Sequence, residues 1–240
     1  MSGHSKWHNI AAKKGKADAA RGKIFTKLGR ELLIAVKEGG PEPAGNSKLK
    51  AVIAKCKAAN MPNDTITNAI KKASASNENY EEIVYEGYGP NGVAIIVNAS
   101  TDNRNRTAAD VRHIFDKFGG NLGTTGCVSY MFEKKGVIVI EKESTNLSED
   151  DLMLIALDNG ADNLESEEDY YEITCAPAEF SHLRESLENE GLTFVEADVQ
   201  LVPNTYVKLD ENGQRKMELI IEKLDELDDV IEIFHNWDEE

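Results

Sequence analysis

The sequence predicts an α+β protein with an N-terminal three-helix bundle, a middle α/β domain completed by the C-terminal segment, and an inserted ferredoxin-like domain. Apolar residues recur with a helical period of three to four before residue 79 and mainly with a strand period of two after it. From residue 136 the predicted elements follow the order β-α-β-β-α-β, which is typical of a ferredoxin-like fold. At 240 residues and 40% hydrophobic, the chain can form one large core or two to three small ones.

The first domain is predicted to be a basic arm followed by three helices. Residues 1 to 22 are polar and rich in Lys, Ala and Gly, so we expect a mobile arm or a marginal helix. Residues 23 to 79 contain three stretches with an apolar stripe at helical spacing. The second stretch ends before Pro62, and Asn63 or Asp64 is placed to cap the third.

The middle domain is predicted to span residues 80 to 135 and 204 to 240. It begins with a hairpin around Asn91-Gly92, a sequence typical of tight turns between strands. Thr107-x-x-Asp110 resembles a capping box and predicts the start of a helix, and residues 127 to 132 read as another strand. One hairpin, one helix and one strand bury too little alone, so we expect residues 204 to 240 to return and complete this domain.

The inserted domain is predicted to span residues 136 to 203. Its two helices should end at Gly160 and Gly191, because glycine commonly follows a helix C-terminus. The stretch from 141 to 172 is rich in Asp and Glu and has Lys142 as its only cation. It lacks the spacing of a calcium loop, so it reads as a solvated acidic face that could also dock a basic protein.

Charge is divided sharply along the chain. Residues 1 to 79 hold fifteen Lys and Arg against six Asp and Glu, whereas the whole protein has a net charge of -16. An acidic protein with one compact cationic end usually has an anionic partner for that end, and nucleic acid is the first candidate. The alternative is that the basic end only neutralises the acidic part or keeps the chain soluble.

The basic segment supplies most of the predicted contacts to nucleic acid, either as a helical ridge or as an extended arm with one aromatic side chain for stacking. These contacts are Lys6, Trp7, Lys13, Lys14, Lys16, Arg21, Lys23, Lys27 and Arg30. A second predicted cluster, at the entry to the middle-domain helix, consists of Arg104, Arg106 and Arg112. A helix N-terminus beside arginines suits a phosphate, but Arg104 and Arg106 could equally pair with acidic neighbours. No element typical of sequence-specific base readout is present.

The remaining motifs give little support to catalysis or cofactor binding. The loop from Gly119 to Gly126 lacks the Gly-Lys-Ser/Thr ending of a P-loop, so a tight turn is favoured over a phosphate cradle or a KH-type clamp. The five histidines are scattered, and the three cysteines have no metal-site spacing. We therefore predict no enzyme activity, no metal and no cofactor. We expect the cysteines to be small buried apolar residues.

The expected location is the cytoplasm or an organelle matrix. No stretch approaches the length of a membrane span or a signal peptide, and the odd, widely spaced cysteines argue against a disulfide framework. We expect a soluble monomer without a membrane partner.

Five motifs in the first 130 residues closely resemble those of the YebC family, which includes the mitochondrial translational activator of cytochrome c oxidase. The motifs are specific as a set, whereas the rest of the chain matches in the order of its elements. They are Gly3-His4-Ser5-Lys6-Trp7, Lys23-Ile24-Phe25-Thr26-Lys27-Leu28, Tyr85-Glu86-Gly87-Tyr88-Gly89-Pro90, Thr101-Asp102-Asn103-Arg104-Asn105-Arg106-Thr107 and Gly119-Gly120-Asn121-Leu122-Gly123.

The resemblance implies three domains and a role in gene expression. Members of the family are commonly labelled probable transcriptional regulators that bind DNA, while the mitochondrial branch and some bacterial members are linked to translation on the ribosome. A Lys-rich arm with no base-reading element suits ribosomal RNA at least as well as a duplex operator. The hypothesis is a non-enzymatic regulator that binds the ribosome or RNA. The alternatives are a DNA-binding transcriptional regulator and a protein-docking adaptor that uses the acidic domain.

Overall fold

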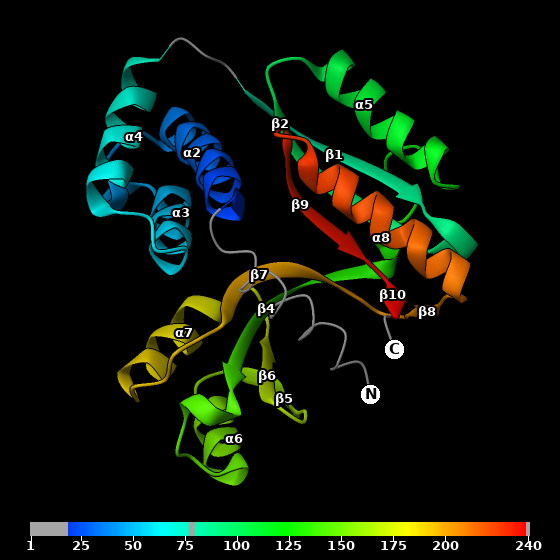
Figure 1. Ribbon diagram of the computed structural model, residues 1–240. Helices are drawn as coiled ribbons and strands as arrows, with labels where there is room; N and C mark the ends of the chain where they lie inside the picture. Colours follow the sequence, from blue (N-terminus) through cyan, green and yellow to red (C-terminus); the bar gives the residue numbers. More distant parts are fainter. Residues whose placement is uncertain (1–18, 77–79, 239–240) are drawn as a thin grey trace. The chain divides into compact units, whose positions relative to one another are not determined.

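The computed structural model describes residues 19–76 and 80–238, with side chains described from residue 22 onward (Figure 1). The described residues form two compact units. One unit contains the residues up to 129 together with 209–235, and the other contains residues 130–208 together with 236–238. The predicted arm up to residue 18 lies outside the described residues.

The first described elements are three helices: α2 (Ala19–Gly39), α3 (Ser47–Ala58) and α4 (Asn63–Ala75). Their apolar stripes form one buried cluster that includes Leu32 and Leu49. Asn46 joins the first two helices, because its Oδ1 accepts a hydrogen bond from Leu49 N while its Nδ2 donates to the carbonyl groups of Ala35 and Gly40. Helix α2 begins at Ala19, within the segment that the sequence pattern assigned to the arm.

The middle domain is a four-stranded sheet with the order β3-β1-β2-β9. Its elements are β1 (Glu81–Tyr88), β2 (Ala94–Thr101), α5 (Arg104–Lys117), β3 (Asn121–Leu122), α8 (Glu211–Glu226) and β9 (Val230–His235). Strand β9 pairs antiparallel with β2, so the C-terminal segment supplies one edge of the sheet. Helices α5 and α8 pack beside each other, and contacts link α5 with β1 and α8 with β9 (Figure 1). The hairpin between β1 and β2 turns at Asn91 and Gly92, whose φ angles of 54° and 82° are left-handed, as expected for Asn-Gly.

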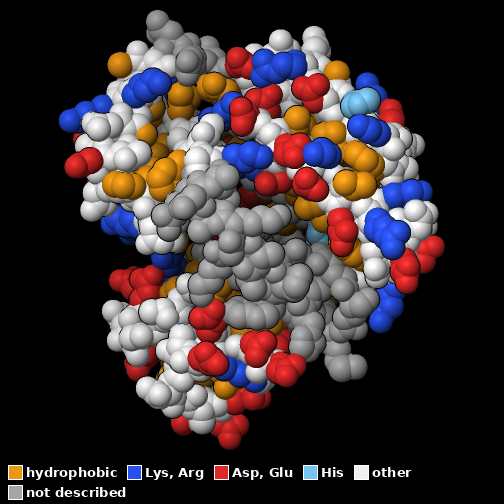
Figure 2. All heavy atoms as spheres, viewed as in Figure 1, with side chains coloured by type: hydrophobic (Ala, Val, Ile, Leu, Met, Phe, Trp, Pro, Cys, Tyr) orange, Lys and Arg blue, Asp and Glu red, His pale blue; other side chains and the backbone are white. Residues whose placement is uncertain are grey.

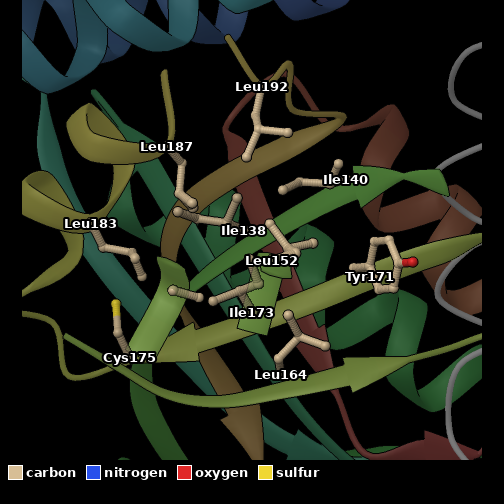
Figure 3. Packing of buried hydrophobic residues seen from close by; sticks show 11 residues of the cluster. Ile138, Ile140, Leu152, Leu164, Tyr171, Ile173, Cys175, Leu183, Leu187 and Leu192 are labelled. Carbon is tan, nitrogen blue, oxygen red and sulfur yellow. The ribbon is translucent and has the colours of Figure 1, made fainter. Parts of the chain in front are cut away.

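The second unit has a β-α-β-β-α-β order and a sheet with the strand order β5-β6-β4-β7, all neighbours antiparallel. Its elements are β4 (Phe132–Glu141), α6 (Glu149–Asp158), β5 (Ala161–Ser166), β6 (Tyr170–Cys175), α7 (Phe180–Asn189) and β7 (Glu196–Pro203). Figure 3 shows side chains from both helices meeting those of the sheet, for example Leu152 and Leu183 against Ile138 and Ile173. A short parallel pair, β8 (Val207–Lys208) and β10 (Trp237–Asp238), completes the unit. The α+β fold class predicted from the sequence is confirmed.

Three local predictions were wrong. Helix α5 is capped by Asn103, whose side chain accepts from Arg106 N, and Thr107 instead lies buried in the first turn. Helix α4 starts directly after Pro62 without a side-chain cap, so neither Asn63 nor Asp64 has that role. Residues 127–128 form a bend and Ser129–Met131 a short 3-10 helix instead of a strand, because the Glu86 carboxylate accepts backbone hydrogen bonds from Val128 and Ser129.

Candidate nucleic-acid interface

Two of the predicted cations on α2 are held by acids of the C-terminal segment. Lys27 Nζ lies 2.6 Å from Asp225 Oδ1. Arg30 NH1 lies 2.7 Å from Asp229 Oδ1 and donates to the carbonyl oxygen of Asp228 at 2.6 Å. Both cations are therefore already engaged within the protein.

Asp229 is the centre of a polar cluster that joins α2, β2, α5 and the turn before β9. Its Oδ2 accepts hydrogen bonds from Arg106 NH2 at 2.8 Å, from Thr107 Oγ1 at 2.7 Å and from Thr101 Oγ1 at 3.2 Å. Burial opposes ionisation of this carboxyl group, but the hydrogen bonds from Arg106, Thr107 and Arg30 outweigh it and hold the pKa of Asp229 below its usual value. The carboxylate therefore acts as an ionised acceptor that ties these elements together.

A small open pocket of about 220 Å³ lies beside this cluster. Two arginines, Arg30 and Arg106, and three aspartates, Asp110, Asp228 and Asp229, contribute to its lining. Since the carboxylates outnumber the guanidinium groups, an added phosphate would meet net negative charge. The pocket is thus poorly suited to an anion.

The three arginines of the second predicted cluster have different surroundings. Arg106 pairs with both Asp102 and Asp229, as the alternative to a phosphate site anticipated. Arg104 and Arg112 are exposed, and neither forms an ion pair within the described part of the chain. The cap made by Asn103 already uses one of the amide groups at the start of α5. Only Arg104 and Arg112 thus remain open to an external phosphate in this region.

Helices α3 and α4 carry exposed lysines that the sequence analysis did not single out. Helix α3 contains four lysines and no acid. Lys48 pairs with Glu38 and Glu82, and Lys55 pairs with Glu232. The other exposed lysines of these two helices form no ion pair among the residues that the structure describes: Lys50, Lys57, Lys71 and Lys72.

The geometry of α3 places two of these lysines together. Lys50 and Lys57 are seven residues apart, about two helical turns, and therefore lie on one face of the helix. Lys71 and Lys72 lie near the end of α4, where Lys72 is in the last turn. We call Lys50, Lys57, Lys71 and Lys72 the outward lysines. The absence of acid from α3 was the sequence signal that could have found the first two.

Several other predicted contacts lie outside what the structure describes. These are Lys6, Trp7, Lys13, Lys14 and Lys16, and the side chain of Arg21. Lys23, in the first turns of α2, is exposed. Its charge lies near Glu226 and helps to lower the pKa of that carboxyl group, after the larger contribution of the hydrogen bond from Lys223.

The glycine-rich loop after α5 is organised from within the protein. Glu86 Oε1 accepts a hydrogen bond from Gly126 N at 2.8 Å, and Oε2 accepts from Val128 N and Ser129 N at 2.9 Å. Burial of Glu86 favours its neutral form, but these backbone hydrogen bonds outweigh burial and lower its pKa. The amide group of Gly126 and two amide groups just after the loop are thus occupied by a carboxylate and are not available to a phosphate.

Glycine is required in this loop and in the facing strand β1 for close backbone packing. A Cβ on Gly87 would lie 2.6 Å from the carbonyl oxygen of Asn121, and one on Gly120 would lie 2.7 Å from the carbonyl oxygen of Tyr88. These contacts bring β3 against β1. The glycines of the two motifs therefore have a packing role, which agrees with the interpretation as a turn.

The described residues offer no arrangement typical of a metal site or a membrane span. No three His, Cys, Asp or Glu side chains among them are placed to share a metal ion. None of the helices described is both long and apolar enough to cross a bilayer. The cysteines are unpaired thiols, and burial raises the pKa of Cys56 and Cys175 to about 11, so both are poor nucleophiles at neutral pH.

The fold and the surface charges define a multidomain α+β protein whose helical part is basic and whose ferredoxin-like part is acidic. The chain belongs to the TACO1/YebC family. The family model for the TACO1/YebC protein N-terminal domain matches residues 5–76, and the model for the TACO1/YebC second and third domain matches residues 80–237. The resemblance noted in the sequence is confirmed.

Relatives cover nearly the whole chain. A protein of Acetivibrio thermocellus is 62% identical over 99% of both chains, and one of Clostridium beijerinckii is 58% identical over the full length of both. Each bears the name "Probable transcriptional regulatory protein". The crystal structure of a conserved hypothetical protein, Aq1575 from Aquifex aeolicus, is 42% identical and superposes with a TM-score of 0.82, covering 93% of this chain and 92% of that one. The names of the Acetivibrio and Clostridium proteins are those of regulatory proteins rather than enzymes.

Proposed function

We propose that this protein is a non-enzymatic regulator of gene expression that binds nucleic acid through its helical bundle and the basic segment before it. The main support for the proposal is that the cations of the bundle fall into two groups, those paired with described acids of the same chain and those without such a pair. Lys27 and Arg30 are paired with internal acids, whereas the outward lysines have no acid partner within the described residues. Cations without internal partners are those that can neutralise phosphates and release counterions.

We further propose ribosomal RNA as the target, with action in translation in the cytoplasm. The described part of the bundle presents lysines and no pair of exposed aromatic side chains, so its contacts would be to phosphates and would carry no base information. A partner of fixed shape and dense phosphate can be recognised by such contacts alone. The acidic domain adds long-range repulsion, which disfavours indiscriminate binding to any polyanion.

The second candidate is a DNA-binding transcriptional regulator. The names of the relatives support this function directly, because they refer to transcription. A transcriptional regulator must discriminate among sequences by base-edge contacts or by DNA shape. Dependence of affinity on sequence is therefore the property that separates the two candidates.

The test compares binding to purified ribosomes and to duplex DNA of random and promoter sequence across a salt series. We expect ribosome binding to persist at about 150 mM salt while duplex binding is lost. Lys50→Glu/Lys57→Glu should weaken ribosome binding by at least about tenfold and reduce its dependence on salt. Lys27→Gln should leave the affinity nearly unchanged, because Asp225 already engages this cation.

The matched control is Lys134→Glu/Arg215→Glu, which reverses the same number of charges outside the bundle. Equal weakening by the control would show an effect of net charge alone and would contradict a binding face on the bundle. Tight, sequence-dependent duplex binding without ribosome binding would replace the first candidate with the second. Binding to neither would contradict both.

A further inference from the structure

Helix α6 of the ferredoxin-like domain has an outward face that its own fold does not use. The helix packs inward through Leu152 and Ala156, which are fully buried. Leu154 and Leu157 point away from this core and have exposed fractions of 65% and 49%. They are three residues apart and therefore neighbours on the helix surface.

The second helix of the same domain provides an internal comparison. Helix α7 covers the same core with Leu183 and Leu187, and its exposed positions are polar or charged, as in Ser181, His182 and Glu185. Single exposed apolar residues are normal on protein surfaces. Two adjacent exposed leucines on a helix of ten residues form a small apolar patch. Of the two helices described in this domain, only α6 has such a patch.

Acidic side chains border this patch. Asp150, Leu154, Leu157 and Asp158 fall within an arc of about 100° on α6, at 100° per residue. Within the described residues no cation pairs with Glu149, Asp150 or Asp158, and the one lysine of the surrounding acidic stretch, Lys142, lies over the ring of Tyr171. In Figure 2 the visible surface of this domain, in the lower part of the view, carries many Asp and Glu side chains and few cations.

Helix stability accounts for only part of this arrangement. Acids in the first turn, including Glu149 and Asp150, favour a helix N-terminus. Asp158 lies at the C-terminal end, where a negative charge is unfavourable, and exposed leucines gain nothing from the helix dipole. The apolar patch and the acid at its C-terminal side thus remain unexplained by the fold.

We propose that the outward face of α6 docks a protein segment that is rich in Lys or Arg and carries apolar side chains at helical spacing. The acids exclude nucleic acid and anionic lipid, since both would be repelled. A second copy of this chain would set the same acids opposite one another in a symmetric contact. A basic amphipathic segment can pack its apolar side chains against the leucines and pair its cations with the carboxylates.

The test uses the full-length protein and a fluorescent synthetic peptide of lysines with leucines at i, i+3 and i+7. We expect saturable binding by fluorescence anisotropy, weakened at least about tenfold by Leu154→Ser/Leu157→Ser. Asp150→Asn/Asp158→Asn should weaken binding and reduce its dependence on salt. The matched controls, Leu219→Ser on α8 and Glu185→Gln/Glu190→Gln in and just after α7, should bind as the unmodified protein does.

Three results would overturn the proposal. Equal binding of a peptide with the leucines replaced by serine would show attraction by charge alone. Concentration-dependent dimerisation in analytical ultracentrifugation that Leu154→Ser/Leu157→Ser abolishes would make a second copy the occupant. Stronger peptide binding by Lys13→Glu/Lys14→Glu/Lys16→Glu would identify the basic segment of this chain as the occupant. Circular dichroism confirms that each variant is folded.

Discussion

The helical bundle and the ferredoxin-like domain use charge in opposite ways. In the bundle, cations are divided between inward ones that bind acids of the middle domain, such as Arg30, and outward ones that bind no described acid, such as Lys50. In the ferredoxin-like domain, an apolar core between the sheet and the helices stabilises the fold. Most acids of α6 form no ion pair with a cation among the described residues. Ion pairs therefore contribute to the structure of the helical bundle. In the ferredoxin-like domain, by contrast, the acids of α6 are available to bind a partner protein.

The largest effect is expected from removal of Asp229, the acceptor at the centre of the polar cluster. Asp229→Ala leaves Arg30, Arg106 and Thr107 without the carboxylate that they share, and the side chain of Asp229 is only 12% exposed. We expect a loss of about 3 kcal/mol or more in the free energy of unfolding, measured in urea. Asp225→Ala removes a partner that is 61% exposed and should cost less than about 1 kcal/mol. Equal losses would contradict a structural role specific to Asp229.

The two buried carboxylates, Asp229 and Glu86, should make the stability of the protein depend on pH. The pKa values of Asp229 and Glu86 are both lowered in the folded protein. Such groups contribute stability that is fully present above their unfolded pKa, about 4, and that is lost as pH falls through the folded pKa. The free energy of unfolding should therefore fall on acidification from about pH 5 downward.

The control for this pH effect is Asp229→Asn/Glu86→Gln. This variant cannot lose the two carboxylates by protonation, so its stability should fall less steeply over the same pH range, although it starts from a lower value at neutral pH. Urea denaturation at several pH values measures both curves. Parallel curves would show that other carboxylates account for the acid sensitivity.

The sequence predicted the helices and strands better than the helix caps and loops between them. Periodicity separated the helical part of the chain before residue 79 from the strand-containing part after it, because apolar stripes are local signals. The cap of α5 was misplaced because Thr107 is used by Asp229, a residue 122 positions away. The strand expected near residue 130 is a bend followed by a short 3-10 helix, because Glu86, about forty residues earlier, accepts hydrogen bonds from the backbone of this segment.

For the candidate nucleic-acid interface, too, contacts between residues far apart in the sequence could not be predicted. Net charge along the chain identified the basic bundle, but it could not distinguish cations that pair with acids of the same chain from cations that do not. Lys27 and Asp225 are 198 residues apart, and only the tertiary fold brings them into contact. The acid-free composition of α3, by contrast, is a local feature and was available in the sequence.

The smallest predicted effect concerns the two ends of α6. Neither Asp150 nor Asp158 pairs with a described cation, so their effects on stability should come mainly from the helix dipole. Asp150→Asn, near the N-terminus, should destabilise the protein by about 0.5 kcal/mol, while Asp158→Asn, at the C-terminus, should stabilise it by a similar amount. Urea denaturation at low salt measures both, and high salt should reduce both. If Asp158→Asn instead destabilised the protein as much as Asp229→Ala, the acids of this domain would be structural, and the contrast between the two regions would fail.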